Sequence, residues 1–139
     1  MILDVANVEG FDFSFAAELL VPLLTAIPKA YSGRFLIAEH LNDVTRENLS
    51  IALELNDLAM IERRRDGLRL VGKVGPTDRQ TFELLSRARG IVSAPDLART
   101  LGIALTTTNE RLGKLVKLGL ARREDPDTQG RAFRYAVPG

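Results

Sequence analysis

The sequence predicts a mixed α+β and α/β chain with two small halves. A βαβαββ half covers residues 1–74, and a helix-rich half ending in a β-hairpin covers residues 75–139. Gly75-Pro76 interrupts any regular element between them. Strand-like and helix-like apolar spacings alternate before this point, as expected of helices packed on a largely parallel sheet. Residues 1–75 contain 8 Lys and Arg and 11 Asp and Glu, a net −3, whereas residues 76–139 contain 11 and 7, a net +4.

The composition predicts a folded protein that lacks the usual parts of catalytic sites. Of the 139 residues, 45% are hydrophobic and 27% charged, which is enough for a buried core. The absence of Cys and the single His exclude a disulfide framework, a thiol nucleophile and a Cys/His zinc site. No nucleophile elbow or phosphate-binding loop is present, so we expect no enzyme, no catalytic or metal-binding residue and no cofactor.

The N-terminus has no signal-peptide pattern, and no apolar run reaches the roughly 18 residues of a membrane span. We therefore expect a cytoplasmic protein that does not contact a membrane.

The first strand and helix of the N-terminal half are read from apolar spacing. Residues 2–8 have the length and pattern of a strand. Apolar side chains then recur at helical spacing from Phe15 to Ile27, behind Asp12 or Ser14 as N-cap. Pro22 falls inside this helix, where we expect a kink.

The rest of this half contains a strand, a helix and a hairpin. Residues 35–38 are a short apolar run, and Thr45-Arg46-Glu47 opens a helix. Its apolar face consists of Leu49, Ala52, Leu53 and Leu58. Residues 60–65 and 68–71 flank Asp66-Gly67, and an Asp-Gly pair between two such runs predicts a β-hairpin.

One stretch of this half carries a family resemblance. Gly10-Phe11-Asp12-Phe13-Ser14-Phe15-Ala16, between a strand and an apolar helix, resembles the STAS-like domains in which an SFA motif opens the helix. The resemblance covers residues 1 to about 73 and implies a module for dimerisation, signal input or protein binding. The leading β-hairpin of that family is missing, which implies an open sheet edge that a second copy would cover.

Ser14 and His40 are the two residues of this half that could have a chemical role. Ser14 corresponds to the serine that is phosphorylated in anti-sigma antagonists, which makes it a candidate phosphoacceptor. The bulky neighbours Phe13 and Phe15 favour the alternative, a helix cap. We expect a structural role for His40, because no nucleophile motif accompanies it.

In the second half, Thr77-Asp78-Arg79-Gln80 has the pattern of a capping box that opens a helix ending at Gly90. Phe82 and Leu85 form its buried stripe, with Leu84 beside them, and Ile91-Val92 follows as a very short strand.

Two further helices predict a helix-turn-helix. Ser93 caps the first, which Gly102 ends. The second runs from Leu105 or Thr106 to Leu118, with a core stripe of Thr108, Leu112 and Leu115. Two short helices joined by a Gly-containing turn are typical of this DNA-binding motif.

The same stretch resembles winged-helix regulators of the MarR and ArsR type, over residues 78–137. The resemblance is carried by three segments: Pro95-Asp96-Leu97-Ala98-Arg99-Thr100-Leu101-Gly102-Ile103, Thr106-Thr107-Thr108-Asn109-Glu110-Arg111-Leu112 and Leu115-Val116-Lys117-Leu118-Gly119-Leu120. Ala104 stands where a capping Ser is usual. The polar loop 124–131 between two strands implies a wing, in which Glu124, Asp125 and Asp127 oppose the attraction of phosphates.

The resemblance and the charge point to double-stranded DNA as partner. The candidate contacts are the polar residues of the second helix and the wing arginines: Thr106, Thr107, Asn109, Glu110, Arg111, Lys114, Arg131 and Arg134. Short polar groups and Arg can read base edges, and Lys and Arg bind phosphates.

We therefore expect a homodimeric, DNA-binding transcription regulator whose N-terminal half dimerises or receives a signal or a protein partner. The alternative is an interaction adaptor of the anti-sigma-antagonist type without direct DNA contact.

Overall fold

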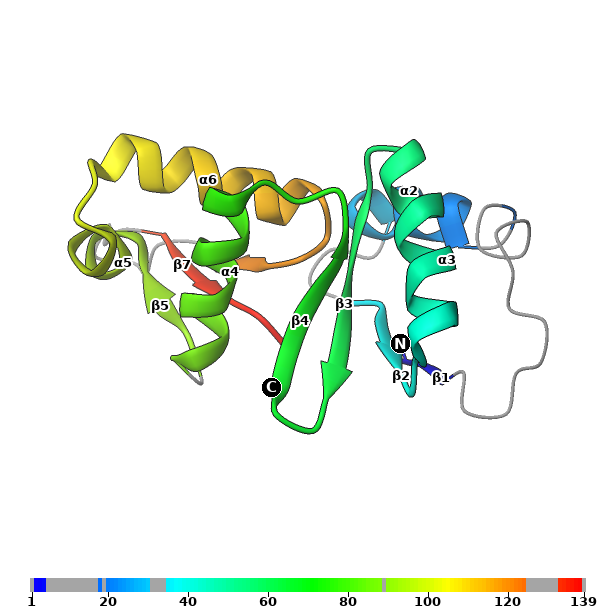
Figure 1. Cartoon of the computed structure of the whole chain (residues 1–139). Helices are drawn as coiled ribbons and strands as arrows, with labels where there is room; N and C mark the ends of the chain where they lie inside the picture. The colour runs from blue at the N-terminus through cyan, green and yellow to red at the C-terminus, as the bar shows by residue number, and fades with distance from the viewer. Residues whose placement is uncertain are drawn as a thin grey trace.

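A computed structural model describes residues 2–4, 18, 20–30, 35–88, 90–124 and 133–138 (Figure 1). The first half consists of β1 (Ile2–Asp4), α2 (Val21–Ala30), β2 (Ile37–Glu39), α3 (Asp43–Leu55), β3 (Ala59–Arg64) and β4 (Gly67–Gly72). The second half consists of α4 (Pro76–Arg87), β5 (Val92–Ser93), α5 (Ala94–Leu101), α6 (Leu105–Lys117), β6 (Arg122–Glu124) and β7 (Arg134–Ala136). The predicted βαβαββ order is confirmed, while the STAS-like resemblance stays a prediction because its motif, residues 10–16, lies outside the described residues.

The four strands of the first half form one sheet in the order β1-β2-β3-β4. β2 pairs in parallel with β1 and with β3, and β4 pairs antiparallel to β3. The largely parallel sheet and the hairpin are thus confirmed. The hairpin register ends at Arg64↔Gly67, so its turn is Arg65-Asp66, and Gly67, with a φ of 128°, is the first residue of β4.

Two predicted helix starts differ from the structure, and the predicted caps Asp12 and Ser14 lie outside the described residues. α3 begins at Asp43 because Asn42 is its N-cap, and the Asn42 side chain accepts from the Thr45 N–H at 2.8 Å. α4 begins at Pro76 behind Gly75, so the capping box at Thr77 is wrong: Thr77 is already helical and its carbonyl accepts from the Thr81 hydroxyl. Before α2, Glu18 and Leu20 are π-helical, so Pro22 lies just after the change from π-helical to α-helical backbone, and the predicted kink there stays a prediction.

The end of α4 also differs from the prediction. The helix ends at Arg87, three residues before Gly90, and the short strand is β5 at Val92–Ser93. The predicted apolar stripe is confirmed, because Phe82 and Leu85 are fully buried.

The sheet of the first half is covered on both faces. α2 and α3 pack on one face, where Ala38, Met60 and Val71 belong to the same core cluster as Leu49 and Leu53. The alternate residues of these strands point the other way and join the core of the second half, in which Ile37, Ile61 and Leu70 cluster with Phe82 and Leu112. The β3–β4 hairpin therefore lies between the two helical layers (Figure 1).

The boundary at Gly75-Pro76 stays a prediction, and limited proteolysis checks it. We expect the first cuts at residues 74–78 or in the wing loop 125–132, before any cut inside the helices, because turn-rich segments are preferred sites. If residues 74–78 resist cleavage while the wing is cut, the shared core makes the two halves one unit.

Among the helices that the structure describes, none is long and apolar enough to cross a membrane.

Candidate nucleic-acid interface

The helix-turn-helix is formed by α5 and α6. The Ser93 hydroxyl accepts from the Asp96 N–H at 3.3 Å and starts α5. Gly102 ends it with a φ of 69°, and its N–H donates to the carbonyl of Ala98 at 2.9 Å. Without a side-chain cap at Ala104, the first turn of α6 is held by Thr108, whose N–H and hydroxyl both donate to the Ala104 carbonyl at 3.0 Å. Three predictions are thus confirmed: Ser93 as the N-cap of α5, Gly102 as its end, and the absence of a side-chain cap before α6.

α6 is amphipathic, and its polar face contains most of the predicted contacts. Thr108, Leu112 and Leu115 are fully buried, as predicted, and fix the helix on the core. Six of the predicted DNA contacts lie on α6. The side chains of Thr106, Glu110 and Lys114 are exposed, and those of Thr107, Asn109 and Arg111 are half-buried.

Lys114 is exposed but not free. Its Nζ lies 2.7 Å from Oδ2 of Asp78, a buried residue in the first turn of α4. A phosphate contact would compete with this ion pair, and removal of Lys114 would leave a buried carboxylate without its partner. Arg111, for which the structure gives no ion pair among the described residues, is the cleaner probe of DNA contact.

Asn109 is half-buried, and its Oδ1 is buried without a hydrogen-bond partner in the part of the chain that the structure describes. A base contact through this oxygen would therefore require another rotamer.

Lys117 is a candidate that the sequence reasoning missed. It is exposed and lies seven residues after Glu110 and eleven after Thr106, on the same side of α6. The helical period alone could have found it. Lys117 also lines a groove of about 450 Å³ with Leu24 of α2 and Arg123 of β6, so the first half lies close to this end of α6.

The wing strands place their arginines on two sides of a sheet with the order β5-β7-β6. Arg123 pairs in register with Tyr135, which is buried in the same cluster as Leu112 and Leu115 of α6. Burial raises the pKa of the Tyr135 hydroxyl, and nearby Arg123 offsets part of this rise. The Arg123 guanidinium also lies 4.6 Å from the ring centre of Phe133, a cation–π distance.

Arg134 occupies the next position along β7, so its exposed side chain projects from the opposite face, as do those of Arg122 and Glu124. The structure thus brings Arg123, not predicted as a contact, to the α6 side and does not bring Arg134 there. Arg131, Ser14, Asp125 and Asp127 lie outside the described residues.

His40 lies away from this interface. It has a φ of 62°, and its Nδ1 lies 2.8 Å from Oδ1 of Asp4. Asp4, Glu39 and His40 each have one potential ligand atom within 4.8 Å of the others, but Glu39 also forms an ion pair with Arg63 at 3.2 Å.

Residues 74–132 match the model of the MarR family. We call this segment the MarR-family domain after that match. The MarR-family domain contains α4, β5, α5, α6 and β6, and the match continues through the wing loop.

The other comparisons add little. A search of curated proteins finds no match to the chain. Among solved structures, the chain is similar to a possible transcriptional regulator from Methanosarcina mazei Go1, with 13% sequence identity and a TM-score of 0.43. That alignment covers 48% of this chain and 57% of the other, so this chain spans just over half of that protein.

Proposed function

We propose that the chain is a DNA-binding transcription regulator whose helix α6 reads the major groove of duplex DNA. The observation that carries this proposal is a MarR-family domain whose helix-turn-helix presents Thr106, Glu110 and Lys117 on one exposed face. The net +4 of the second half favours a polyanionic partner.

Within this proposal, the predicted set divides by role. Arg111 and Arg131 bind phosphates and supply affinity, whereas Thr106 and Thr107, at the start of α6, reach base edges and supply sequence preference. Lys117 and Arg123 extend the cationic surface on the α6 side.

The direct test is fluorescence anisotropy with random duplex DNA at several salt concentrations. We expect Arg131→Ala to weaken binding to all sequences alike and to lower the slope of log affinity against log salt by about one, because one phosphate contact is lost. Thr107→Ala should instead change the preference among sequences. Lys73→Ala removes one exposed positive charge that is paired with Asp57, and it serves as the control.

An unchanged affinity and salt slope in both Arg131→Ala and Arg111→Ala would contradict the proposal. If a protein partner were lost in these variants instead, the wing would be a docking surface and the adaptor function would replace DNA binding.

We further propose that the first half mediates dimerisation and receives a signal or a protein partner. β1 is the first strand in the sheet order β1-β2-β3-β4, and its Ile2 side chain is 54% exposed. A second copy that pairs with β1 would extend the sheet and cover this apolar side chain.

Sedimentation of the full chain tests the dimer. We expect a dimer at micromolar concentration that Ile2→Asp weakens, because the new charge would be buried at the strand edge. Val44→Asp, at a 66% exposed apolar position on α3, should have no effect. A monomer at high micromolar concentration would place any dimer contact elsewhere.

A further inference from the structure

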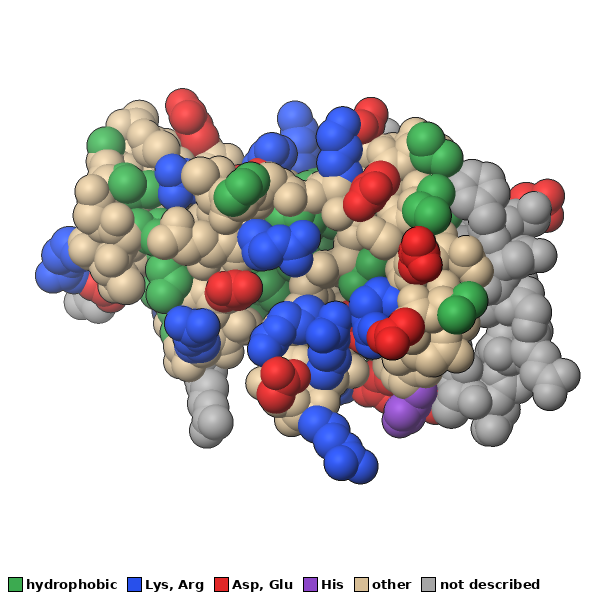
Figure 2. Space-filling view, viewed as in Figure 1, with side chains coloured by type: hydrophobic (Ala, Val, Ile, Leu, Met, Phe, Trp, Pro, Cys, Tyr) green, Lys and Arg blue, Asp and Glu red, His purple; other side chains and the backbone are tan. Residues whose placement is uncertain are grey.

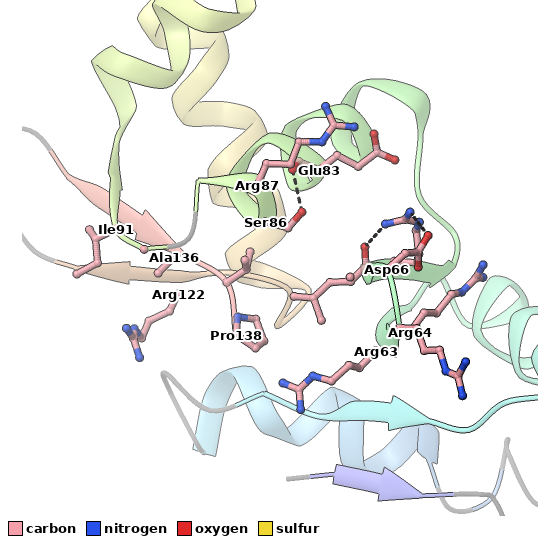
Figure 3. A pocket seen from close by; sticks show the side chains of 16 residues that line it. Arg63, Arg64, Asp66, Glu83, Ser86, Arg87, Ile91, Arg122, Ala136 and Pro138 are labelled. Carbon is pink, nitrogen blue, oxygen red and sulfur yellow. Dashed lines mark hydrogen bonds and ion pairs between the residues drawn. The ribbon is translucent and has the colours of Figure 1, made fainter.

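An arginine-lined cavity lies between the two halves, on the side of the wing sheet opposite α6. Its volume is about 1000 Å³, at the upper end of the range for small-molecule sites. The β3–β4 hairpin forms one wall, and the end of α4, β6 and residues 136–138 form the other. Figure 3 shows Arg63 and Arg122, one from each half, on either side of Pro138.

The lining of the cavity is strongly cationic. It contains Arg63, Arg64, Arg65, Arg69, Arg87 and Arg122, against two acidic residues, Asp66 and Glu83. Lys and Arg side chains accordingly gather over the β3–β4 hairpin in the space-filling view (Figure 2). Arginine predominates here, and its planar guanidinium suits bidentate binding of phosphate and carboxylate groups.

Within the part of the chain that the structure describes, two of these arginines have no carboxylate partner for their side chains. Arg63, Arg64, Arg69 and Arg122 form ion pairs with carboxylates at 2.8 to 3.3 Å. The side chains of Arg65 in the hairpin turn and Arg87 at the end of α4 form neither hydrogen bonds nor ion pairs with the described residues, and both are exposed. Arg65 and Arg87 are therefore available to an external anion.

The cavity also has an apolar side that could contact the carbon skeleton of a ligand. Ile91 is 47% exposed, and the side chains of Leu68, Val137 and Pro138 beside it are half-buried. A concave site with convergent charges next to an apolar wall fits a small charged molecule better than the convex backbone of duplex DNA.

We propose that this cavity binds a small molecule bearing two or more negative charges on phosphate groups, and that this ligand is the effector of the regulator. The effector role rests on the proposed DNA-binding function. A ligand that contacts both walls binds best at one relative position of the hairpin and the MarR-family domain. It therefore changes DNA affinity if that position differs between free and DNA-bound protein.

Calorimetric titration of the full chain with inorganic pyrophosphate, ADP and adenosine tests the site without DNA. We expect pyrophosphate and ADP to bind and adenosine not to bind. Tighter binding of ADP would indicate an organic phosphate that uses the apolar wall, and equal binding would indicate recognition of the phosphate groups alone.

The test variant combines Arg65→Gln with Arg87→Gln. The control variant is Arg99→Gln. The double variant removes no ion pair of the described residues, so it should keep its thermal stability. It should weaken ADP and pyrophosphate binding by about tenfold or more, since charge-assisted contacts are lost. Arg99→Gln removes an exposed arginine of α5 outside the cavity and should leave ligand binding unchanged.

Three results would overturn the site. The first is no binding of pyrophosphate or ADP at millimolar concentration, and the second is equal binding of these anions by the double variant and Arg99→Gln. The third is a loss of duplex binding in the double variant as large as its loss of ADP binding. The last result would make the cavity part of the DNA surface. Ligand binding that leaves DNA affinity unchanged would overturn the effector role. Anion binding without any DNA binding would overturn the proposed function and not the site.

Discussion

Replacing Arg46 by Ala should lower the free energy of unfolding by about 3–5 kcal/mol, because it leaves a buried carboxylate without its main partner. Glu62 of β3 is only 2% exposed. Arg46 of α3 binds it in a bidentate manner, with Nη2 donating to Oε1 at 2.7 Å and Nε to Oε2 at 3.0 Å. Urea denaturation at pH 7 measures the loss.

Arg64→Ala is the matched control for this prediction. Arg64 also donates to Oε2 of Glu62, at 3.1 Å, but its side chain is 41% exposed. Because solvent screens such a contact, we expect a loss of about 1 kcal/mol or less.

The pH dependence separates the charge of Arg46 from its packing. Burial raises the pKa of Glu62, but hydrogen bonds from Arg46 and Arg64 outweigh burial and hold the pKa below its usual value. Such a lowered pKa stabilises the fold above the unfolded-state pKa of about 4.3, and this contribution is lost as the pH falls through the folded-state pKa. The stability difference between wild type and Arg46→Ala should therefore narrow below about pH 4. An equal difference at pH 7 and pH 3 would mean that only the packing of the Arg46 stem was lost.

Gly72→Ala should destabilise the chain by about 2–5 kcal/mol, as the sum of backbone strain and a steric clash. Gly72, at the end of β4, has a φ of 110°. An added Cβ would lie 2.5 Å from the carbonyl oxygen of Leu58 and 2.9 Å from the Cβ of Leu53. The Leu58 carbonyl cannot easily move, because it accepts from the Lys73 N–H at 2.9 Å.

Gly67→Ala is the control for the steric term in the same thermal or urea unfolding experiment. Gly67 also has a positive φ, 128°, but the nearest atom to its added Cβ is Nη1 of Arg69, 3.8 Å away. We expect only the strain, about 1–3 kcal/mol. A loss in Gly72→Ala no larger than that in Gly67→Ala would show that the backbone at Leu58 relaxes around the new side chain.

The helix-turn-helix could be predicted because its signals are local. Ser93 and Gly102 act within one helical turn, and the spacing of Thr108, Leu112 and Leu115 defines the buried side of α6 whatever lies opposite. The start of α4 was mispredicted for an equally local reason: Pro76 is well suited to the first turn, and the polar pattern after it only resembles a capping box.

The site was only partly predictable. The period of α6 identifies which side chains are exposed, but not that Lys114 is paired with Asp78, 36 positions earlier in the chain. The alternation of β7 puts Arg134 and Tyr135 on opposite sides of the sheet, but only the packing of Tyr135 in the core with α6 shows which of them points toward that helix.

The order of the elements, the caps of α5 and the amphipathic face of α6 follow from the sequence alone, because each depends on residues a few positions apart. Tertiary contacts decided that the MarR-family domain packs on the second face of the sheet, that Glu62 is buried beneath Arg46, and that arginines from the hairpin, α4 and β6 line one cavity. These features join residues tens of positions apart, and no local spacing records which surfaces meet when the apolar faces of sheet and helices are removed from water.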